Sequence, residues 1–145
     1  MLSKYFSLEE MIFSQTAVRN GIDNTPGVNE IENLKRLCSE LLDPLCDVLG
    51  LNIRVSSGYR SATLNKKIGG AANSQHVKGQ AADINAEGLT ANELYEKIKI
   101  GSALNFDQLI QEFDSWVHIS WAVNPRCECL IAKKIGGKTA YFKDE

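Results

Sequence analysis

The order of hydrophobic patterns along the chain is the feature that most limits its possible folds. Apolar residues recur at helical spacing from Ile31 to Leu49, and Gly50 is a natural helix stop. Short apolar or β-branched segments that predict strands follow at residues 51–57, 81–85, 106–113 and 116–122. Because helices come first and strands later, we expect an α+β domain.

Three capping signals predict where helices begin, each joining Ser, Thr or Asn to a glutamate three residues later. The pairs are Ser7 and Glu10, Asn29 and Glu32, and Thr90 and Glu93. Pro44 is expected to kink or divide the second helix. Residues 58–80 are rich in Gly, Ser, Asn and Lys, which predicts a functional loop with a short helix near 62–67. After Asn124 the pattern is mixed, with 133–141 adding strand or loop.

Composition excludes several classes of protein. The 145 residues predict a single domain spanning 1–145. A net charge of -2 argues against nucleic acid as the main partner. No segment approaches the roughly 18 apolar residues that membrane insertion requires. The N-terminal residues do not resemble a secretory signal, so we expect synthesis in the cytoplasm. Reduced thiols are expected at Cys38, Cys46, Cys127 and Cys129.

The chain has only two histidines, so any histidine-based site can be enumerated. His76 precedes Asp83, with Gly79 between them to let the loop turn back toward a strand. His118 shares one strand face with Trp116 and Ser120. Two histidines and one carboxylate, with a fourth position open to water, are typical of a catalytic zinc site.

Four segments carry a resemblance to a known family. Ser74, His76, Gly79, Ala81 and Asp83 resemble the S-x-H-x-x-G-x-A-x-D signature of zinc D-alanyl-D-alanine carboxypeptidases and related phage endolysin peptidases. The segment 116–118 is similar to their second-histidine motif, 56–61 to their upstream S-x-Y-R segment, and 106–112 to the strand before the last ligand. The resemblance spans roughly residues 5–125 in the right order.

The resemblance implies one zinc per chain, bound by His76, Asp83 and His118. It also implies a hedgehog-type scaffold, in which a small antiparallel sheet carries the zinc and helices pack on one side. Zinc would polarise the scissile carbonyl and lower the pKa of water. A carboxylate must then pass the proton from that water to the leaving amine.

The acid that transfers the proton is open to two assignments. Many relatives carry an acid three residues before the last histidine, where this chain has Ser115. Glu112 and the alternative Asp114 remain as candidates. A two-residue turn would put Glu112 on the face opposite His118, whereas a three-residue connection would put it on the same face. We favour Glu112, because an acid at an apolar strand end can have a raised pKa.

Substrate-binding residues are predicted around this centre. By resemblance, Arg60 would bind the terminal carboxylate of the substrate or orient its carbonyl, and a guanidinium suits either role. Ser74 is a candidate for a hydrogen bond to substrate or to the zinc shell. The further candidates are Gln75 and Tyr59 for substrate. Trp116 and Trp121 are candidates for the cleft wall, although we expect at least one of the two to pack in the core.

The sequence thus predicts a zinc metallopeptidase acting on peptidoglycan stem peptides. The bond would be the terminal D-Ala-D-Ala bond or an internal L-Ala–D-amino-acid bond. The setting would be cell-wall lysis by a phage or prophage enzyme, which reaches the wall after release or by another export route. The alternative is a non-catalytic zinc-containing wall-binding or virion module on the same scaffold.

Overall fold

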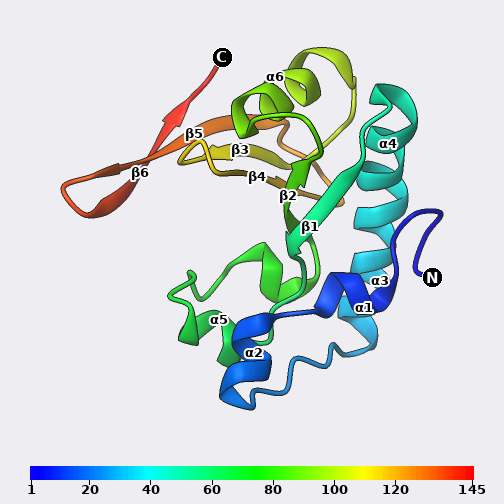
Figure 1. Cartoon of the computed structure of the whole chain (residues 1–145), viewed down its shortest axis with the longest axis vertical. Coiled ribbons are helices and arrows are strands. Elements are labelled where there is room, and N and C mark those ends of the chain that lie inside the picture. The colour runs from blue at the N-terminus through cyan, green and yellow to red at the C-terminus, as the bar shows by residue number, and fades with distance from the viewer.

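The computed structural model describes residues 1–145 and contains one six-stranded sheet with the strand order β1-β2-β4-β3-β5-β6 (Figure 1). The strands are β1 (Ile53–Ser57), β2 (Ala81–Ala86), β3 (Gln108–Glu112), β4 (Trp116–Ser120), β5 (Glu128–Ile135) and β6 (Lys138–Lys143). Neighbouring strands run antiparallel except β3 and β5, which are parallel. The expected α+β class, with a mostly antiparallel sheet, is confirmed.

The helical elements precede or connect the strands. They are α1 (Leu8–Ile12), α2 (Gln15–Asn20), α3 (Val28–Leu37), the π-helical η1 (Cys38–Leu42), α4 (Asp43–Leu49), α5 (Ala62–Lys67), the 3-10 helix η2 (Gln75–Lys78) and α6 (Ala91–Gly101). None of them is both long enough and apolar enough to span a membrane.

Two of the three predicted caps are present as complete capping boxes. The Ser7 hydroxyl accepts the Glu10 amide while the Glu10 carboxylate accepts the Ser7 amide, and Thr90 and Glu93 repeat this pattern. The prediction at Asn29 is wrong by two residues. Helix α3 has Gly27 as its N-cap, because the Gly27 carbonyl already accepts the amide of Ile31.

Pro44 divides the long helix as predicted, although the chain does not leave the helical path. Proline cannot donate the usual backbone hydrogen bond, and the turn before it widens into the π-helical η1. The Asp43 amide donates to the Cys38 carbonyl across this wider turn. Gly50 then ends α4 in the left-handed conformation, with φ of 63°.

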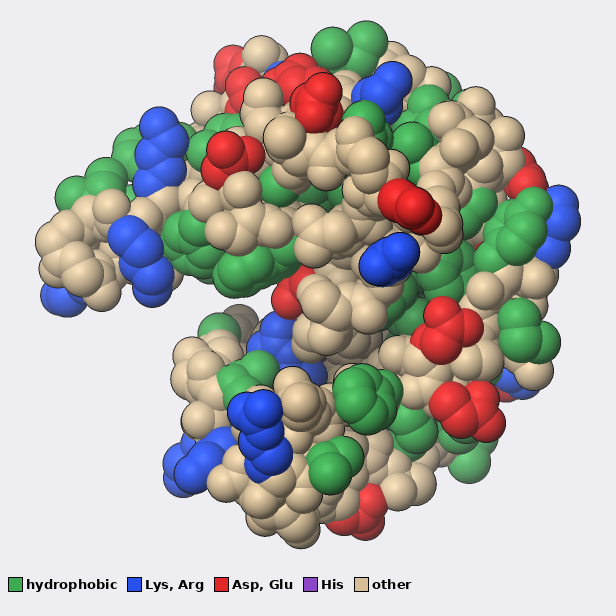
Figure 2. Space-filling model, in the orientation of Figure 1, with side chains coloured by type: hydrophobic (Ala, Val, Ile, Leu, Met, Phe, Trp, Pro, Cys, Tyr) green, Lys and Arg blue, Asp and Glu red, His purple; other side chains and the backbone are tan.

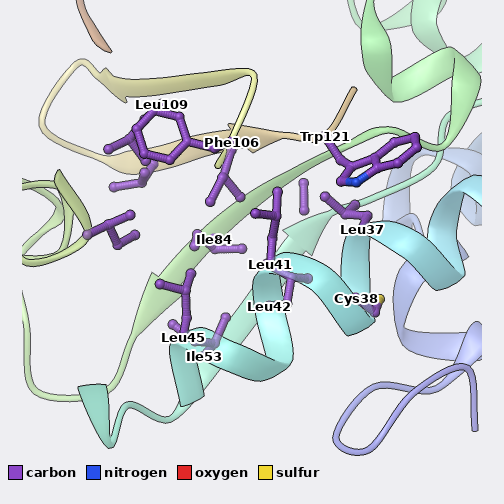
Figure 3. Packing of buried hydrophobic residues seen from close by; sticks show 14 of the residues in the cluster. Leu37, Cys38, Leu41, Leu42, Leu45, Ile53, Ile84, Phe106, Leu109 and Trp121 are labelled. Carbon is purple, nitrogen blue, oxygen red and sulfur yellow. The ribbon is translucent and has the colours of Figure 1, made fainter. Parts of the chain in front are cut away.

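Helices cover one face of the sheet and leave the other face for polar groups. Leu41 and Leu45 from the divided helix face Ile53 and Ile84 of β1 and β2 in Figure 3. Helix α6 packs against β2, β3 and β4 on this side. Because side chains alternate along a strand, the residues between these apolar positions point to the uncovered face. Asp83 and His118 are among them.

Three elements lie outside the predictions, and one of them, η2, falls inside the predicted loop 58–80. Helix α2 is short and buries only Ala17, so it has no hydrophobic period to detect. Strand β5 begins at Glu128, before the predicted segment 133–141, and pairs with β6 to form a hairpin. Both strands of that hairpin carry many lysines, which mask the alternation that predicts a strand.

Candidate metal centre and active-site groove

Three side chains from three elements meet on the uncovered face of the sheet. His76 comes from η2, Asp83 from β2 and His118 from β4, and their candidate ligand atoms all lie within 4.8 Å of one another. His76 Nε2 and His118 Nδ1 each lie 3.2 Å from Asp83 Oδ1. The structure therefore brings together the complete set of metal ligands that the sequence predicts.

Strand register and a close approach between η2 and α3 produce this convergence. Asp83 and His118 are direct partners in the antiparallel β2–β4 ladder. His76 is held by η2, whose N-cap is Ser74 and whose C-cap is Gly79. Gly79 has φ of 74°, and a Cβ there would lie 2.5 Å from the Glu30 carbonyl oxygen. Any other residue would push η2 away from α3 and move His76.

The chemistry of the three ligands fits a cation. His76 Nδ1 lies 2.7 Å from the Gly58 carbonyl oxygen, which can only accept, so Nδ1 carries the hydrogen. Burial lowers the pKa of His76 and favours the neutral ring, which leaves a lone pair on Nε2. That lone pair faces a carboxylate oxygen, an arrangement that a shared metal ion stabilises. A histidine ligand anchored through its other nitrogen is usual in zinc sites.

The carboxylate of Asp83 is held in its ionised form. Burial of Asp83 opposes ionisation, but an imidazole of His76 or His118 that carries a proton toward Asp83 outweighs burial through its charge and hydrogen bond. It lowers the pKa of Asp83 below its ordinary value. The Arg60 guanidinium also reaches Asp83, with 3.4 Å between Nη2 and Oδ2. Its other nitrogens donate to Ser57 and to Asn65, so the guanidinium is fixed on three sides. Arg60 thus lies beside the predicted ligands, as a neighbour of the metal centre.

Glu112 lies on the same face as the three ligands. The connection between β3 and β4 has three residues, and it pairs Glu112 with Trp116. The indole N–H of Trp116 donates to Glu112 Oε2. Burial, and then the negative charge of Asp83, raise the pKa of Glu112. Asp114, by contrast, is exposed at the tip of the hairpin and does not line the groove around the metal ligands.

A groove of about 850 Å³ contains this centre. Figure 2 shows the molecule hollowed between the β5–β6 hairpin and the lobe formed by α2 and α5. Arg60, Ser74, Gln75, Glu112 and Trp116 all line it.

Ser74 and Gln75, like the other three, already have partners within the protein. Ser74 Oγ accepts the His76 amide, and the Gln75 side chain donates to Asp107. The predicted contacts of Ser74 and Gln75 with substrate would therefore compete with hydrogen bonds that hold η2.

Two predicted residues do not reach the groove. Tyr59 packs in the core with 8% of its surface exposed, and Trp121 packs there with 7% exposed. Trp121 is instead covered by the Arg36 guanidinium, 5.5 Å from the ring centre. The position of Tyr59 corrects its prediction, whereas that of Trp121 agrees with the expectation that one of the two tryptophans packs in the core. In both cases the backbone decides which way the aromatic ring faces.

Several residues around the groove were not predicted from the sequence. Buried Asp107 accepts the Arg126 backbone amide and two guanidinium hydrogen bonds, in addition to the one from Gln75. Buried Asn65 holds both Arg60 and the Ala71 carbonyl. For Asp107 the available signal was a charged residue within the predicted strand segment 106–113, whereas Asn65 lies in a largely polar helix and gave no such signal. Tyr141 on β6 also lines the groove.

Comparison with known proteins agrees with this site. A segment of 34 residues is 53% identical to the zinc D-Ala-D-Ala carboxypeptidase of Streptomyces albus G, and it covers 23% of this chain and 13% of that relative. The sequence profile of the family described as Peptidase M15 matches residues 4–120. Because that match extends over more than half of the chain, this protein belongs to the peptidase M15 family.

Proposed function

We propose that residues 1–145 form a single zinc peptidase domain that hydrolyses peptidoglycan stem peptides. Membership of the M15 family and the similarity to a zinc carboxypeptidase support a zinc-dependent peptidase. The observation that carries the proposal is the convergence of His76, Asp83 and His118 beside Glu112 in one groove. A zinc-binding module without catalysis would have no need of a half-buried carboxylate at that position.

His76, Asp83 and His118 would hold the zinc ion in this proposal. When bound, zinc supplies a Lewis acid that polarises a peptide carbonyl and lowers the pKa of water. Gly58 fixes the His76 ring through Nδ1, and Arg60 steadies Asp83, so neither ligand needs to reorganise on binding. The three ligand side chains are therefore preorganised for zinc binding.

Glu112 is the general base and then the general acid. Its Oε2 is held by the Trp116 indole, which leaves Oε1 to take a proton from water and deliver it to the leaving amine. Its raised pKa suits both steps, because a carboxyl group that is too acidic releases a proton readily but does not accept one. Asp114 cannot replace it without moving the hairpin tip.

We propose Arg60 as the residue that orients the substrate carbonyl or binds its terminal carboxylate. The guanidinium is largely buried beside Asp83, which places a fixed positive charge next to the candidate ligands. Charge that develops on a carbonyl oxygen is stabilised best by donors that are already in place. Ser74 and Gln75 act mainly by holding η2 in this scheme.

The test is mass spectrometry of purified muropeptides incubated with the zinc-loaded protein, with and without a chelator. Products that differ by one terminal D-Ala assign carboxypeptidase activity, and products split between L-Ala and a D-amino acid assign endopeptidase activity. No product in either arm, from a protein shown to hold zinc, would identify a non-catalytic module. Lysis of bacterial cells from outside by the same preparation tests the proposed role as a phage or prophage lysis enzyme.

A further inference from the structure

The β5–β6 hairpin forms one wall of the groove, although it lies beyond residue 120, where the family match ends. In Figure 1 it projects away from the rest of the sheet, coloured orange to red. Direct strand pairs join Trp116 to Glu112, Glu112 to Ala132, and Ala132 to Tyr141. The four residues therefore form one row across the sheet, on the face that carries the metal ligands.

Tyr141 lies at the outer end of this row. Only the small side chain of the fully buried Ala132 separates it from Glu112. Burial, followed by the charges of Glu112 and Asp83, raises the pKa of Tyr141, so its hydroxyl keeps its proton. The side chain is 56% exposed, so this hydroxyl is free to donate to a molecule in the groove.

Lys134 continues the same face by one more pair. It lies opposite Thr139, and its Nζ is 3.2 Å from the Thr139 hydroxyl and 5.2 Å from the centre of the Phe113 ring. The two arginines of the groove are paired with Asp83 and Asp107. Lys134 is the cation lining the groove that forms no ion pair with a carboxylate of the protein.

We propose that Lys134 and Tyr141 form a subsite for a carboxylate of the substrate that lies apart from the scissile bond. Glu112 and Tyr141 are two strand spacings apart, a distance of about 10 Å. An extended peptide covers about 3.4 Å per residue. The carboxylate would therefore be borne about three residues from the cleaved bond. This inference rests on the proposed peptidase function and specifies the substrate class as an acidic peptide.

The experiment uses two synthetic stem peptides that differ at one position about three residues from the scissile bond. One carries a free carboxylate there and the other a carboxamide. For the native protein, we expect KM to be about fivefold lower for the carboxylate peptide, as a partly exposed ion pair with one added hydrogen bond would give. Lys134→Met should make the two KM values equal, and Tyr141→Phe should reduce their ratio.

Lys133→Met is the matched control, because Lys133 is the neighbouring lysine on the opposite face of the same strand and does not line the groove. It should retain the fivefold ratio. Equal KM values for the native protein would overturn the inference. So would equal losses in the two lysine variants, because they would indicate a general effect of charge.

A binding measurement separates this inference from the proposed function. Calorimetry on zinc-loaded Glu112→Gln compares the Kd of the two peptides without turnover. If the native protein cleaves neither peptide, the proposed function fails for these substrates. A preference of about fivefold for the carboxylate peptide in calorimetry would still support the subsite, and equal Kd values would overturn it.

Discussion

The two walls of the groove are built on different principles. The inner wall is formed by η2, β2, β4, the end of β3 that carries Glu112 and the turn that carries Arg60. Nearly every polar group in it is paired: His76 with Gly58, Asp83 with Arg60, and Gln75 with Asp107. The outer wall, formed by the β5–β6 hairpin, presents the exposed Lys134 and the exposed Tyr141, whose hydroxyl is free. Catalytic groups need fixed positions, whereas groups that select a substrate must remain available to it. The contrast predicts large effects at the inner wall and small ones at the outer wall.

The largest effect is expected at Glu112. Glu112→Gln keeps the size and the hydrogen bond from Trp116 but cannot accept a proton, so kcat should fall by about 10³-fold. Zinc content, measured by atomic emission, should be unchanged. Asp114→Asn is the control and should retain activity. If Asp114→Asn were inactive and Glu112→Gln active, the base would be Asp114.

Removing zinc should destabilise the inner wall and spare the outer one. A ligand present at about 1,000 times its Kd stabilises the folded state by about 4 kcal/mol. Chelation should therefore lower Tm and abolish peptide hydrolysis together. Hydrogen exchange should increase in η2 and at the β2–β4 ladder, with little change in β5 and β6. Uniform loss of protection over both walls would show that the walls are not independent.

Substitutions of Arg60 test whether this residue of the inner wall acts on the substrate or only holds Asp83 in place. Arg60→Ala should lower kcat/KM by about 100-fold at saturating zinc, because a fixed donor to the carbonyl is lost. Arg60→Lys should recover part of this loss, since it restores charge without the planar fork. If zinc affinity falls in Arg60→Ala while kcat/KM at saturating zinc is unchanged, Arg60 serves only to hold Asp83.

Asp107 links the inner wall to the start of the hairpin through Gln75 and Arg126. Hydrogen bonds from Arg126 lower the pKa of Asp107 to about 2, below its ordinary value. The ionised form is thus favoured by folding, and this stability is complete above about pH 4 and is lost as the pH falls toward 2. The contribution is about 1–2 kcal/mol, because Arg126 is half-exposed to water.

Asp107→Asn should remove that pH-dependent part. Denaturant unfolding of both proteins at pH 7 and at pH 3 provides the measurement. The difference in the free energy of unfolding should shrink at the lower pH. A difference that stays constant would assign the effect to lost hydrogen bonds alone.

The smallest effect is expected on the outward face of the hairpin. Phe142 is 46% exposed and faces away from the groove, beside Lys133. Phe142→Ser should change the free energy of unfolding by about 0.5 kcal/mol and leave kcat/KM within about twofold. A large loss of activity would mean that the hairpin acts as a rigid unit and that its two faces are coupled.

The sequence by itself determined the α+β class and the three predicted ligands. Two complete capping boxes and the strands that carry Asp83 and His118 were readable because each depends on residues close together in the chain. The three candidate ligands could be predicted because the chain has only two histidines, each within a family motif.

Tertiary structure decided the rest, because it depends on residues far apart in the chain. The three-residue connection that brings Glu112 to the ligand face became clear only from the β3–β4 register. Tyr59 and Trp121 turned into the core, and Asp107 acquired its partners from two distant segments. Local sequence records which groups are present, while packing and strand register decide which of them share a groove.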